Sequence, residues 1–531
     1  MYSIVHTAVL CGIEARKVAV EADISNGMPV FEMVGFLSSE VKEAKDRVRT
    51  ALKNCGYELP VKRITVNLSP ANIRKSGSGF DLAVAVAVLS AMEIVPKTAL
   101  HQIMMVGEIS LEGRITGISG VLPMVLCAKA EGIGICLVAK ENAHEASLVP
   151  GMQVIGVRHL QEVIGFLQTG NYNASQPDAA ESGRRCVTSD QRDWEAAGAS
   201  IQEKDTQKQY DFSQINGQQL LKRACEVAIS GMHNLLMVGP PGAGKTMIAR
   251  CIPSILPEMS VEEQLELSKI YSVCGLFQER DGLMDQRPFR SPHHTITEQG
   301  LIGGGTIVHP GEISLAHGGV LFLDELTEFK KSTLEVLRQP LEDKCVCLAR
   351  VSGTYCFPAD FVLVAAMNPC NCGYYPDLSR CHCTSQSLQR YHNKLSRPLL
   401  DRIDLCVEAA AVGYEELRKP DPANETSAQI RQRVVAMHAL QKARFAGTGI
   451  RFNSRIPAVR LEQYCPLGSK EEHFMKNIYE RMGLTARTYH KIIRVARTIA
   501  DMDGSRDIEC RHLQEAVCYR SIEQNDWENG L

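Results

Sequence analysis

One short stretch, GPPGAGKT from Gly239 to Thr246, constrains the fold of this chain more than any other. It fits the pattern G-x-x-x-x-G-K-[ST], and it lies between the apolar run NLLMV and the start of a predicted helix. In such a unit, backbone N–H groups surround a phosphate at the amino end of the helix. We therefore predict an α/β core that binds ATP through Gly239, Pro240, Pro241, Gly242, Ala243, Gly244, Lys245 and Thr246.

A second apolar run supplies carboxylates for the same site. GGVLFLDEL, residues 318–326, indicates a buried strand that ends at Asp324 and Glu325. Because carboxylates are costly to bury without partners, we interpret Asp324 and Thr246 as Mg²⁺ ligands and Glu325 as the residue that polarises the attacking water. Lys245 is then expected on the β- and γ-phosphates. The alternative is a strand end that is merely solvated.

A third apolar run, FVLVAAMN, ends in Asn368. The carboxyl ends of parallel strands line the nucleotide crevice of a doubly wound sheet, so we expect Asn368 to reach the γ-phosphate or its water. A phosphate loop, an acidic strand end and a polar strand end in this order resemble the AAA+ ATPases. In that resemblance, Asn368 matches the residue called sensor 1.

The same resemblance implies roles for two arginines. In PLLDRIDL, Arg402 matches the arginine that acts on the γ-phosphate of a neighbouring subunit. In GLTARTYHKIIRVAR, Arg487 at the start of a lid helix matches sensor 2. A surface salt bridge is the alternative for each of them, and Arg397 and Arg494 are competing candidates.

Periodicity divides the 531 residues into three folded parts. Residues 1–168 alternate strand-like and helical runs, residues 210–410 contain isolated buried-strand runs, and residues 421–531 favour helices. Residues 169–209 are polar and lack periodicity, which indicates a linker.

Composition and hydropathy argue against a strongly basic, an exported or a membrane-spanning protein. The net charge is −3, with 44% hydrophobic and 22% charged residues, so any nucleic-acid contact must use a local basic patch. The N-terminal residues lack the pattern of a signal peptide, and the longest apolar run, Leu82–Met92, is too short to span a bilayer. We expect a cytoplasmic protein without membrane attachment, in which most of the 19 cysteines stay reduced.

Longer motifs narrow the resemblance. RPFRSPHHT, PGEISLAHGGVLFLDEL and FVLVAAMNPCNCGYYPD resemble the magnesium-chelatase-like AAA+ proteins and, among these, the ComM/YifB family. The resemblance implies an α/β AAA+ P-loop core with a C-terminal helical lid. It further implies a homo-hexameric motor that uses ATP and Mg²⁺ and acts on DNA as a branch-migration helicase in natural transformation or recombination. A chelatase-like motor that remodels a protein partner and an ATP-dependent protease are the alternatives.

The N-terminal part resembles the Lon protease domain, an α+β fold of the ribosomal S5 domain 2-like type. The resemblance rests on RKSGSGFDLAVA and VGEISLEGRITGISGVLPM. Aligned on Lys75, the nucleophile position falls on Gly79, and aligned on residues 117–120, the position of the Lon lysine falls on Leu122. A Ser–Lys dyad needs a hydroxyl beside a lysine. Ser78 is one residue off, so the protease alternative is disfavoured.

DNA contacts are expected from two segments. In PFRSPHHTITEQGLIGGG, the candidates for the polar tip of an insert are Arg290, His293 and His294. KCVCLARVSGTYCFPADF predicts a hairpin with its turn at Ser352–Gly353 and Arg350 beside the turn. Repeated around a ring, such arginines would follow the backbone of branched or single-stranded DNA without reading its bases. The alternatives are an ordinary structural hairpin and structural histidines.

The loop after Asn368, NPCNCGYYPDLSRCHC, carries four cysteines, namely Cys370, Cys372, Cys381 and Cys383. Four thiolates can complete a tetrahedral Zn²⁺ shell, and a metal could stabilise a loop that has few core residues. The C-x-C spacing is less usual than C-x₂-C, and His382 is a spare ligand. A structural zinc site, packed reduced thiols and a redox element remain as interpretations.

Overall fold

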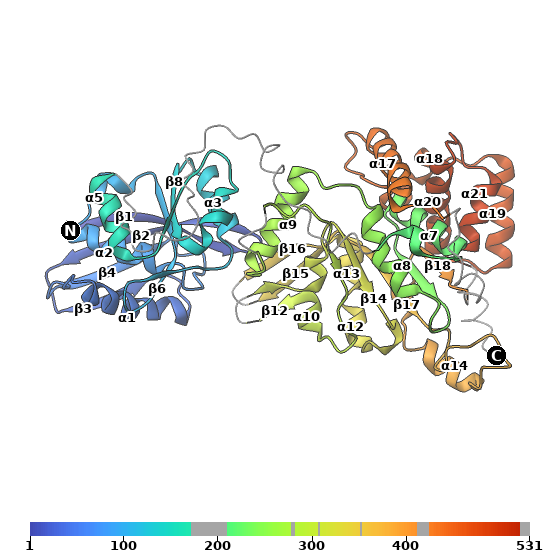
Figure 1. The fold of residues 1–531 in the computed structure, drawn as a ribbon, viewed down its shortest axis with the longest axis horizontal. Helices are drawn as coiled ribbons and strands as arrows, with labels where there is room; N and C mark the ends of the chain where they lie inside the picture. The colour runs from blue at the N-terminus through green and yellow to red at the C-terminus, as the bar shows by residue number, and fades with distance from the viewer. Residues whose placement is uncertain (171–209, 278–281, 306–307, 351–352, 411–423, 521–531) are drawn as a thin grey trace.

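The computed structural model describes residues 1–170, 210–277, 282–305, 308–350, 353–410 and 424–520 (Figure 1). Almost all of the predicted linker, residues 169–209, lies outside these ranges. So do Ser352 of the predicted turn and residues 521–531 of the predicted lid part. The described residues form a mixed α/β structure, as predicted.

The N-terminal part is built on a seven-stranded sheet of order β3-β4-β2-β1-β5-β8-β9. β2 pairs antiparallel with β1 and β4, and the other pairs are parallel. Alternate residues of β2 and β4 are buried, so one side of each strand faces the core. The strands are β1 (Tyr2–Cys11), β2 (Glu14–Ser25), β3 (Val30–Val34), β4 (Arg63–Ser69), β5 (Ile103–Val106), β8 (Ile135–Ala139) and β9 (Gln153–Val157).

Helices cover both faces of this sheet. On one face, α1, α2 and α5 pack with Ile103 and Met105 of β5, and on the other, α3 and α4 pack with Met104 and Val106. Every residue of α2 is buried, which explains the apolar run from Leu82 to Leu89 within it. The elements are α1 (Ser39–Asn54), α2 (Asp81–Ala91), α3 (Val121–Ala130), α4 (Ala143–Ser147), α5 (Leu160–Thr169) and the short pair β6 (Glu108–Ile109) and β7 (Ile115–Thr116).

Five parallel strands in the order β11-β14-β17-β10-β18 form the sheet of the central part. Leu235 and Met237 of β10 enter the apolar cluster that includes the C-terminal helices, whereas Leu236 and Val238 enter the cluster on the other face. Because both faces are covered, the three central strands β14, β17 and β10 are apolar throughout. The five strands are β10 (Leu235–Val238), β11 (Phe289–Arg290), β14 (Val320–Leu323), β17 (Val362–Met367) and β18 (Leu405–Glu408).

The C-terminal part is helical, and its longest buried stripe belongs to α20 (Ala486–Met502). Ile492, Ile493, Ala496 and Ile499 are buried. The side chain of Thr485 caps the helix by accepting a hydrogen bond from the backbone N–H of Thr488. The other C-terminal helices are α17 (Ser427–Arg444), α18 (Leu461–Tyr464), α19 (Ser469–Arg481) and α21 (Cys510–Cys518). The central helices are α7 (Gln219–Gly231), α8 (Lys245–Cys251), α9 (Val261–Val273), α10 (Glu298–Ile302), α11 (Glu312–Leu315), α12 (Lys331–Glu335), α13 (Arg338–Asp343), α14 (Ser385–His392) and α15 (Arg397–Leu400).

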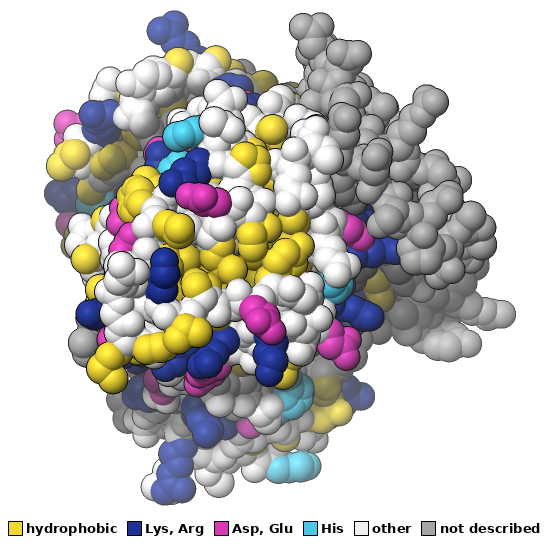
Figure 2. Space-filling view, turned by 90° about the vertical axis from the view of Figure 1, so that its left-hand side faces the viewer, with side chains coloured by type: hydrophobic (Ala, Val, Ile, Leu, Met, Phe, Trp, Pro, Cys, Tyr) yellow, Lys and Arg dark blue, Asp and Glu magenta, His cyan; other side chains and the backbone are white. Residues whose placement is uncertain are grey.

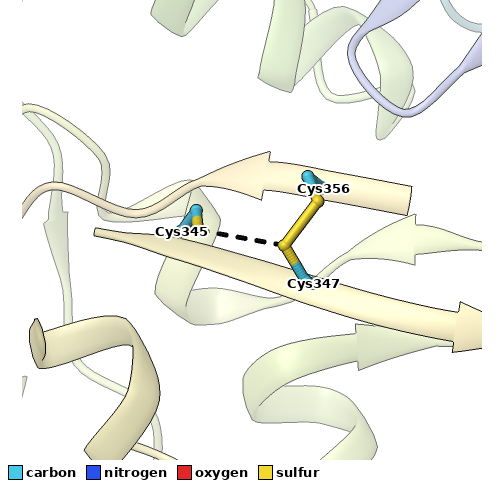
Figure 3. The surroundings of a disulfide bond; sticks show 3 residues. All are labelled: Cys345, Cys347 and Cys356. Atoms are coloured by element: carbon cyan, nitrogen blue, oxygen red, sulfur yellow. Dashed lines mark hydrogen bonds between the residues drawn. A yellow bond between two sulfur atoms is a disulfide. The ribbon is translucent and has the colours of Figure 1, made fainter. Parts of the chain in front are cut away.

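The predicted hairpin is formed by β15 (Cys345–Arg350) and β16 (Gly353–Pro358), which pair antiparallel. Cys347 lies opposite Cys356, and a disulfide bond joins them (Figure 3). The Sγ atom of Cys345 is 3.8 Å from that of Cys347. No other disulfide bond occurs within the described ranges.

The N-terminal part contacts the central part through α9 and the hairpin. The Gly120 N–H donates to the carbonyl oxygen of Ser272 at 2.9 Å, and the Ser272 hydroxyl contacts Glu145. Ile13 packs in a small apolar cluster with residues of α9 and with Phe357 of β16. These contacts place α9 and the hairpin between the two sheets (Figure 1).

The outer end of the N-terminal part carries apolar surface. Figure 2 shows hydrophobic side chains gathered near the middle of this face, with charged side chains around them. Exposed large side chains in this part include Met28 and Phe36, which flank β3. Among the helices that the structure describes, none is long and apolar enough to cross a bilayer.

Candidate ATP site

The phosphate loop connects β10 to α8. Gly242 and Gly244 have φ values of 80° and 82°, in the left-handed region that glycine adopts without strain. Gly239 lies so close to the backbone that follows β18 that a Cβ atom there would be 2.3 Å from the carbonyl oxygen of Ala409. The glycines of the motif therefore allow the backbone to curve around a phosphate at the start of α8.

Lys245 joins the phosphate loop to the end of β17. Its Nζ atom donates to the carbonyl oxygens of Gly239 at 2.6 Å and Pro240 at 2.9 Å, and to Oδ1 of Asn368 at 3.2 Å. Burial lowers the pKa of Lys245, and the nearby carboxylate of Asp324 acts in the opposite direction. The ammonium group thus lies where the three predicted strand ends meet.

The end of β14 brings the predicted Mg²⁺ ligands together. Thr246 donates from Oγ1 to Oδ2 of Asp324 at 2.7 Å. The backbone of Glu325 has a φ of 50°, and its N–H donates to Oδ1 of Asp324 at 3.0 Å. A hydroxyl beside a carboxylate fits Mg²⁺, which prefers oxygen ligands and keeps several waters. Glu325 is 59% exposed, so a water molecule can reach its carboxylate.

His294 lies next to Glu325, a neighbour that the sequence did not indicate. Its Nδ1 atom is 3.6 Å from Oε2 of Glu325, and its ring meets Phe329 edge-on with centroids 6.4 Å apart. The ring of His293 is 4.1 Å from that of His294. Of the two histidines predicted to contact DNA, the structure therefore places His294 beside the predicted water-activating residue.

Arg290 does not have the expected position at the polar tip of an insert. It belongs to β11, the edge strand of the central sheet, and its Nε and Nη2 atoms each donate to the carboxylate of Glu312 at 2.6 Å. These hydrogen bonds raise the pKa of Arg290. Its charge is compensated within the subunit, whereas Arg350 at the end of β15 is exposed.

Arg402 is held inside its own subunit. Its side chain is 10% exposed and pairs with Glu342 at 2.7 Å. It also donates to the carbonyl oxygens of Arg338 at 3.0 Å and Pro398 at 2.6 Å. An arginine that acts on a neighbouring subunit must leave these partners. The competing candidate Arg397 is exposed at the start of α15.

Arg487 is the more accessible of the two candidates for sensor 2. It lies in the first turn of α20, is 62% exposed and is 4.0 Å from Oδ2 of Asp401. Arg494 instead donates from Nε to the carbonyl oxygen of Ile456 at 2.8 Å, and burial lowers its pKa. The geometry therefore favours Arg487 for a contact with a bound phosphate.

Side chains of α20 bind the segment that follows α15. Lys491 donates to the carbonyl oxygen of Ile403 at 2.7 Å. His233 is fully buried, with Nε2 at 2.8 Å from Oγ1 of Thr498 and Nδ1 at 3.8 Å from Asp404. Burial lowers the pKa of His233 to about 4. The lid helix is thus bonded to the chain directly after the predicted trans-acting arginine.

The four cysteines after β17 come together in space. Their Sγ atoms all lie within 4.8 Å of one another. In the part of the chain that the structure describes, they are the one group of three or more His, Cys, Asp or Glu residues whose ligand atoms lie close enough together to share a metal ion. His382 is exposed and is not a member of the group.

The nucleophile position of the Lon-like part lacks a hydroxyl and lies against the end of the Ile118 side chain. A Cβ atom at Gly79 would lie 2.6 Å from Cδ1 of Ile118, and Leu122 is fully buried. Ser78 donates from Oγ to Oε2 of Glu108 at 2.5 Å. A cavity of about 300 Å³ remains here, but the two aligned positions supply neither the hydroxyl nor the amine of a dyad.

Family models match most of the chain. The model described as magnesium chelatase, subunit ChlI, matches residues 211–417, which include the phosphate loop, Asp324, Asn368 and Arg402. The corresponding C-terminal model matches residues 424–520, which include Arg487. A further model, subunit ChlI of Mg-chelatase, matches residues 20–142.

Relatives extend this similarity to the whole chain. Competence protein ComM of Haemophilus influenzae is 40% identical over 522 residues, which cover 98% of this chain and 97% of the relative. The uncharacterized protein YifB of Escherichia coli has the same identity and coverage. Lon protease 2 of Bacillus subtilis is 32% identical over 145 residues, 26% of each chain, which fits a Lon-like N-terminal region. The site, the family models and these relatives agree that the chain belongs to the ComM/YifB family of magnesium-chelatase-like AAA+ proteins.

Proposed function

We propose that this protein is a ring-shaped ATPase motor that acts on DNA, as a branch-migration helicase in natural transformation or recombination. The ATPase activity rests on one observation, the convergence of Lys245, Thr246, Asp324 and Asn368 at the carboxyl ends of neighbouring strands. Action on DNA is supported by the full-length similarity to a competence protein and by the exposed Arg350.

Hydrolysis of ATP would follow from the positions of these side chains. A Mg²⁺ ion held by Thr246 and Asp324 would withdraw negative charge from the phosphates. A phosphate oxygen is a stronger acceptor than the carbonyl groups that Lys245 contacts, so its ammonium group would turn to the β- and γ-phosphates. Asn368, released from Lys245, would hold the attacking water, and Glu325 would accept its proton.

Assembly into a homo-hexamer would complete the site. Arg402 would exchange Glu342 for the γ-phosphate of the neighbouring subunit, which forms stronger charge-assisted hydrogen bonds than a half-exposed carboxylate. Arg487 would approach the phosphates from the lid when α20 moves. Both changes make hydrolysis depend on contact between subunits and on the position of the lid.

The DNA contact would come from the hairpins. The chain carries a net charge of −3, so binding must rely on a local collar in which Arg350 is repeated around the ring. Such a collar contacts phosphates and releases counterions, so affinity should fall steeply as salt rises. Because phosphates carry no base identity, binding should depend little on DNA sequence.

A motor that remodels a protein partner is the second candidate, because the matching models describe subunits of magnesium chelatase. Its ATP site would be the same, and the two candidates differ in whether DNA binds and stimulates hydrolysis. Proteolysis is not proposed, because Gly79 and Leu122 occupy the two positions of the dyad.

Binding and movement of forked DNA test the proposal. With a slowly hydrolysed ATP analogue, the wild-type protein should bind forked DNA at low salt and bind it less at high salt. Arg350→Ala should weaken binding and leave DNA-free hydrolysis unchanged. Arg460→Ala, at an exposed arginine of the C-terminal part, is the matched control and should bind normally. Lys245→Ala should abolish branch movement. If no DNA binds at low salt with the analogue present, the protein-remodelling candidate is favoured.

A further inference from the structure

The cysteine loop, residues 370–383, has the geometry of a thiolate metal site. The Sγ atom of Cys370 is 3.2 Å from that of Cys372 and 3.8 Å from that of Cys381, and Cys372 and Cys381 are 3.5 Å apart. Cys383 lies within 4.8 Å of all three. Sulfur atoms that surround Zn²⁺ tetrahedrally at about 2.3 Å are about 3.8 Å from one another. Small side-chain movements would therefore admit a zinc ion.

The backbone around Cys370 is arranged as it is around a metal-bound sulfur. The N–H groups of Gly373 and Tyr375 both donate to Sγ of Cys370, at 3.2 and 3.4 Å. Gly373 has a φ of 86°, which turns the chain back towards the sulfur. Cys370 is fully buried, and an uncharged thiol is a weak acceptor for two N–H groups. A thiolate bound to a metal suits both donors.

The segment between the two cysteine pairs has little apolar packing of its own. Leu378 is 80% exposed and Tyr374 is 39% exposed. Asp377 accepts hydrogen bonds from the N–H and hydroxyl groups of Ser379, so these bonds stay within the loop. A short loop without a core needs another constraint, which a structural metal can provide.

The loop meets the ATP site at two places. A Cβ atom at Gly373 would lie 2.6 Å from Cδ of Pro241, so the loop packs directly on the phosphate loop. Asn368, which contacts Lys245, precedes the first cysteine by two residues, and its carbonyl oxygen accepts from the hydroxyl of Tyr391 at 3.0 Å. The position of the cysteine loop therefore affects both the phosphate loop and the asparagine.

We propose that Cys370, Cys372, Cys381 and Cys383 bind one structural Zn²⁺ ion, which holds their loop against the phosphate loop and so positions the ATP site. With four sulfur ligands the ion has no open position for a substrate. Nucleotide binding then depends on a metal that takes no part in hydrolysis. This inference shares the ATP site with the proposed function and does not require action on DNA.

Metal analysis of the full chain, purified under reducing conditions without a chelator, tests the site. We expect one zinc ion per chain in the wild type and in Cys518→Ser, which changes an exposed cysteine outside the loop. We expect loss of zinc in the double variant Cys381→Ser, Cys383→Ser. Co²⁺ added to metal-free wild type should give the absorption bands of thiolate-bound cobalt. A wild type without zinc and without these bands, or zinc retained in the double variant, would overturn the site.

Gly373→Ala tests the contact with the phosphate loop. We expect a severalfold higher KM for ATP with zinc retained, because the added methyl group meets Pro241. Gly447→Ala is the matched control, since its φ of 73° imposes the same backbone strain where no atom lies within 4 Å of the added group. An unchanged KM in Gly373→Ala would overturn the inference that the cysteine loop positions the phosphate loop. A protein that binds zinc but never binds DNA would refute the proposed function alone.

Discussion

Replacing Glu325 by glutamine removes a carboxylate and leaves the shape of the side chain almost unchanged. The side chain is 59% exposed and lies 3.6 Å from His294, so we expect the free energy of unfolding to change by less than about 0.5 kcal/mol. Lys245, Thr246 and Asp324 keep their contacts, so the variant should bind ATP as the wild type does.

The effect on hydrolysis should be much larger. A positioned general base accelerates a reaction by about 10²- to 10⁴-fold, which corresponds to about 3–5 kcal/mol of the barrier. Glu325→Gln should therefore release phosphate at least about 100-fold more slowly at saturating ATP. Binding of a fluorescent ATP analogue measures affinity separately, and trapped nucleotide should keep the rings assembled.

Glu328→Gln is the matched control for this experiment. Glu328 lies three residues further along, is 47% exposed and pairs with Lys394 at 3.1 Å, so its variant should hydrolyse ATP at the wild-type rate. If Glu325→Gln hydrolysed ATP within about threefold of the wild type, a barrier change below about 0.7 kcal/mol, water activation by Glu325 would be refuted.

Three further predictions concern the subunit interface and the lid. Arg402→Ala should bind nucleotide without hydrolysing it, and mixing it with Lys245→Ala subunits should restore some activity; no rescue at any ratio would contradict action in trans. Asp501→Ala should lower the free energy of unfolding in denaturant by about 3–5 kcal/mol, because Asp501 is 1% exposed and its loss leaves the charge of Arg444, 2.6 Å away, uncompensated; an unchanged midpoint would count against this. The pKa of His233 is lowered to about 4, so between its ordinary value of 6.5 and about 4 the unfolded chain takes up a proton that the folded chain does not. Acidification through this range should therefore destabilise the wild type more than the variant His233→Gln, by up to about 1.4 kcal/mol per pH unit. If unfolding of the two proteins depended equally on pH, the lowered pKa of His233 would be refuted.

The convergence of residues at the candidate ATP site could be predicted from the sequence because its signals are local. A glycine-rich loop needs residues that tolerate positive φ, and apolar runs that end in Asp324 or Asn368 indicate strands with polar ends. Parallel strands bring such ends to one edge of the sheet. The observed contacts of Lys245 with Asn368 and of Thr246 with Asp324 follow from these rules.

Partners of charged side chains could not be predicted in the same way. His294 lies beside Glu325, and Arg290 pairs with Glu312, although no spacing rule relates either pair. Arg402 is likewise bound within its own subunit, where the motif implies a role in trans. A motif specifies which residue type is needed, whereas packing of distant segments decides what it contacts. The order of the seven-stranded sheet is non-local for the same reason.

Gly79 and Leu122 also limit the routes that evolution can take from this sequence. A mutation of Gly79 to serine would supply a hydroxyl once the end of the Ile118 side chain moved away from the new Cβ atom, but Leu122 would still offer no amine. Recovery of a Ser–Lys dyad therefore needs at least two mutations, and neither of them alone supplies both groups. A single substitution at either position would leave this domain without a complete dyad.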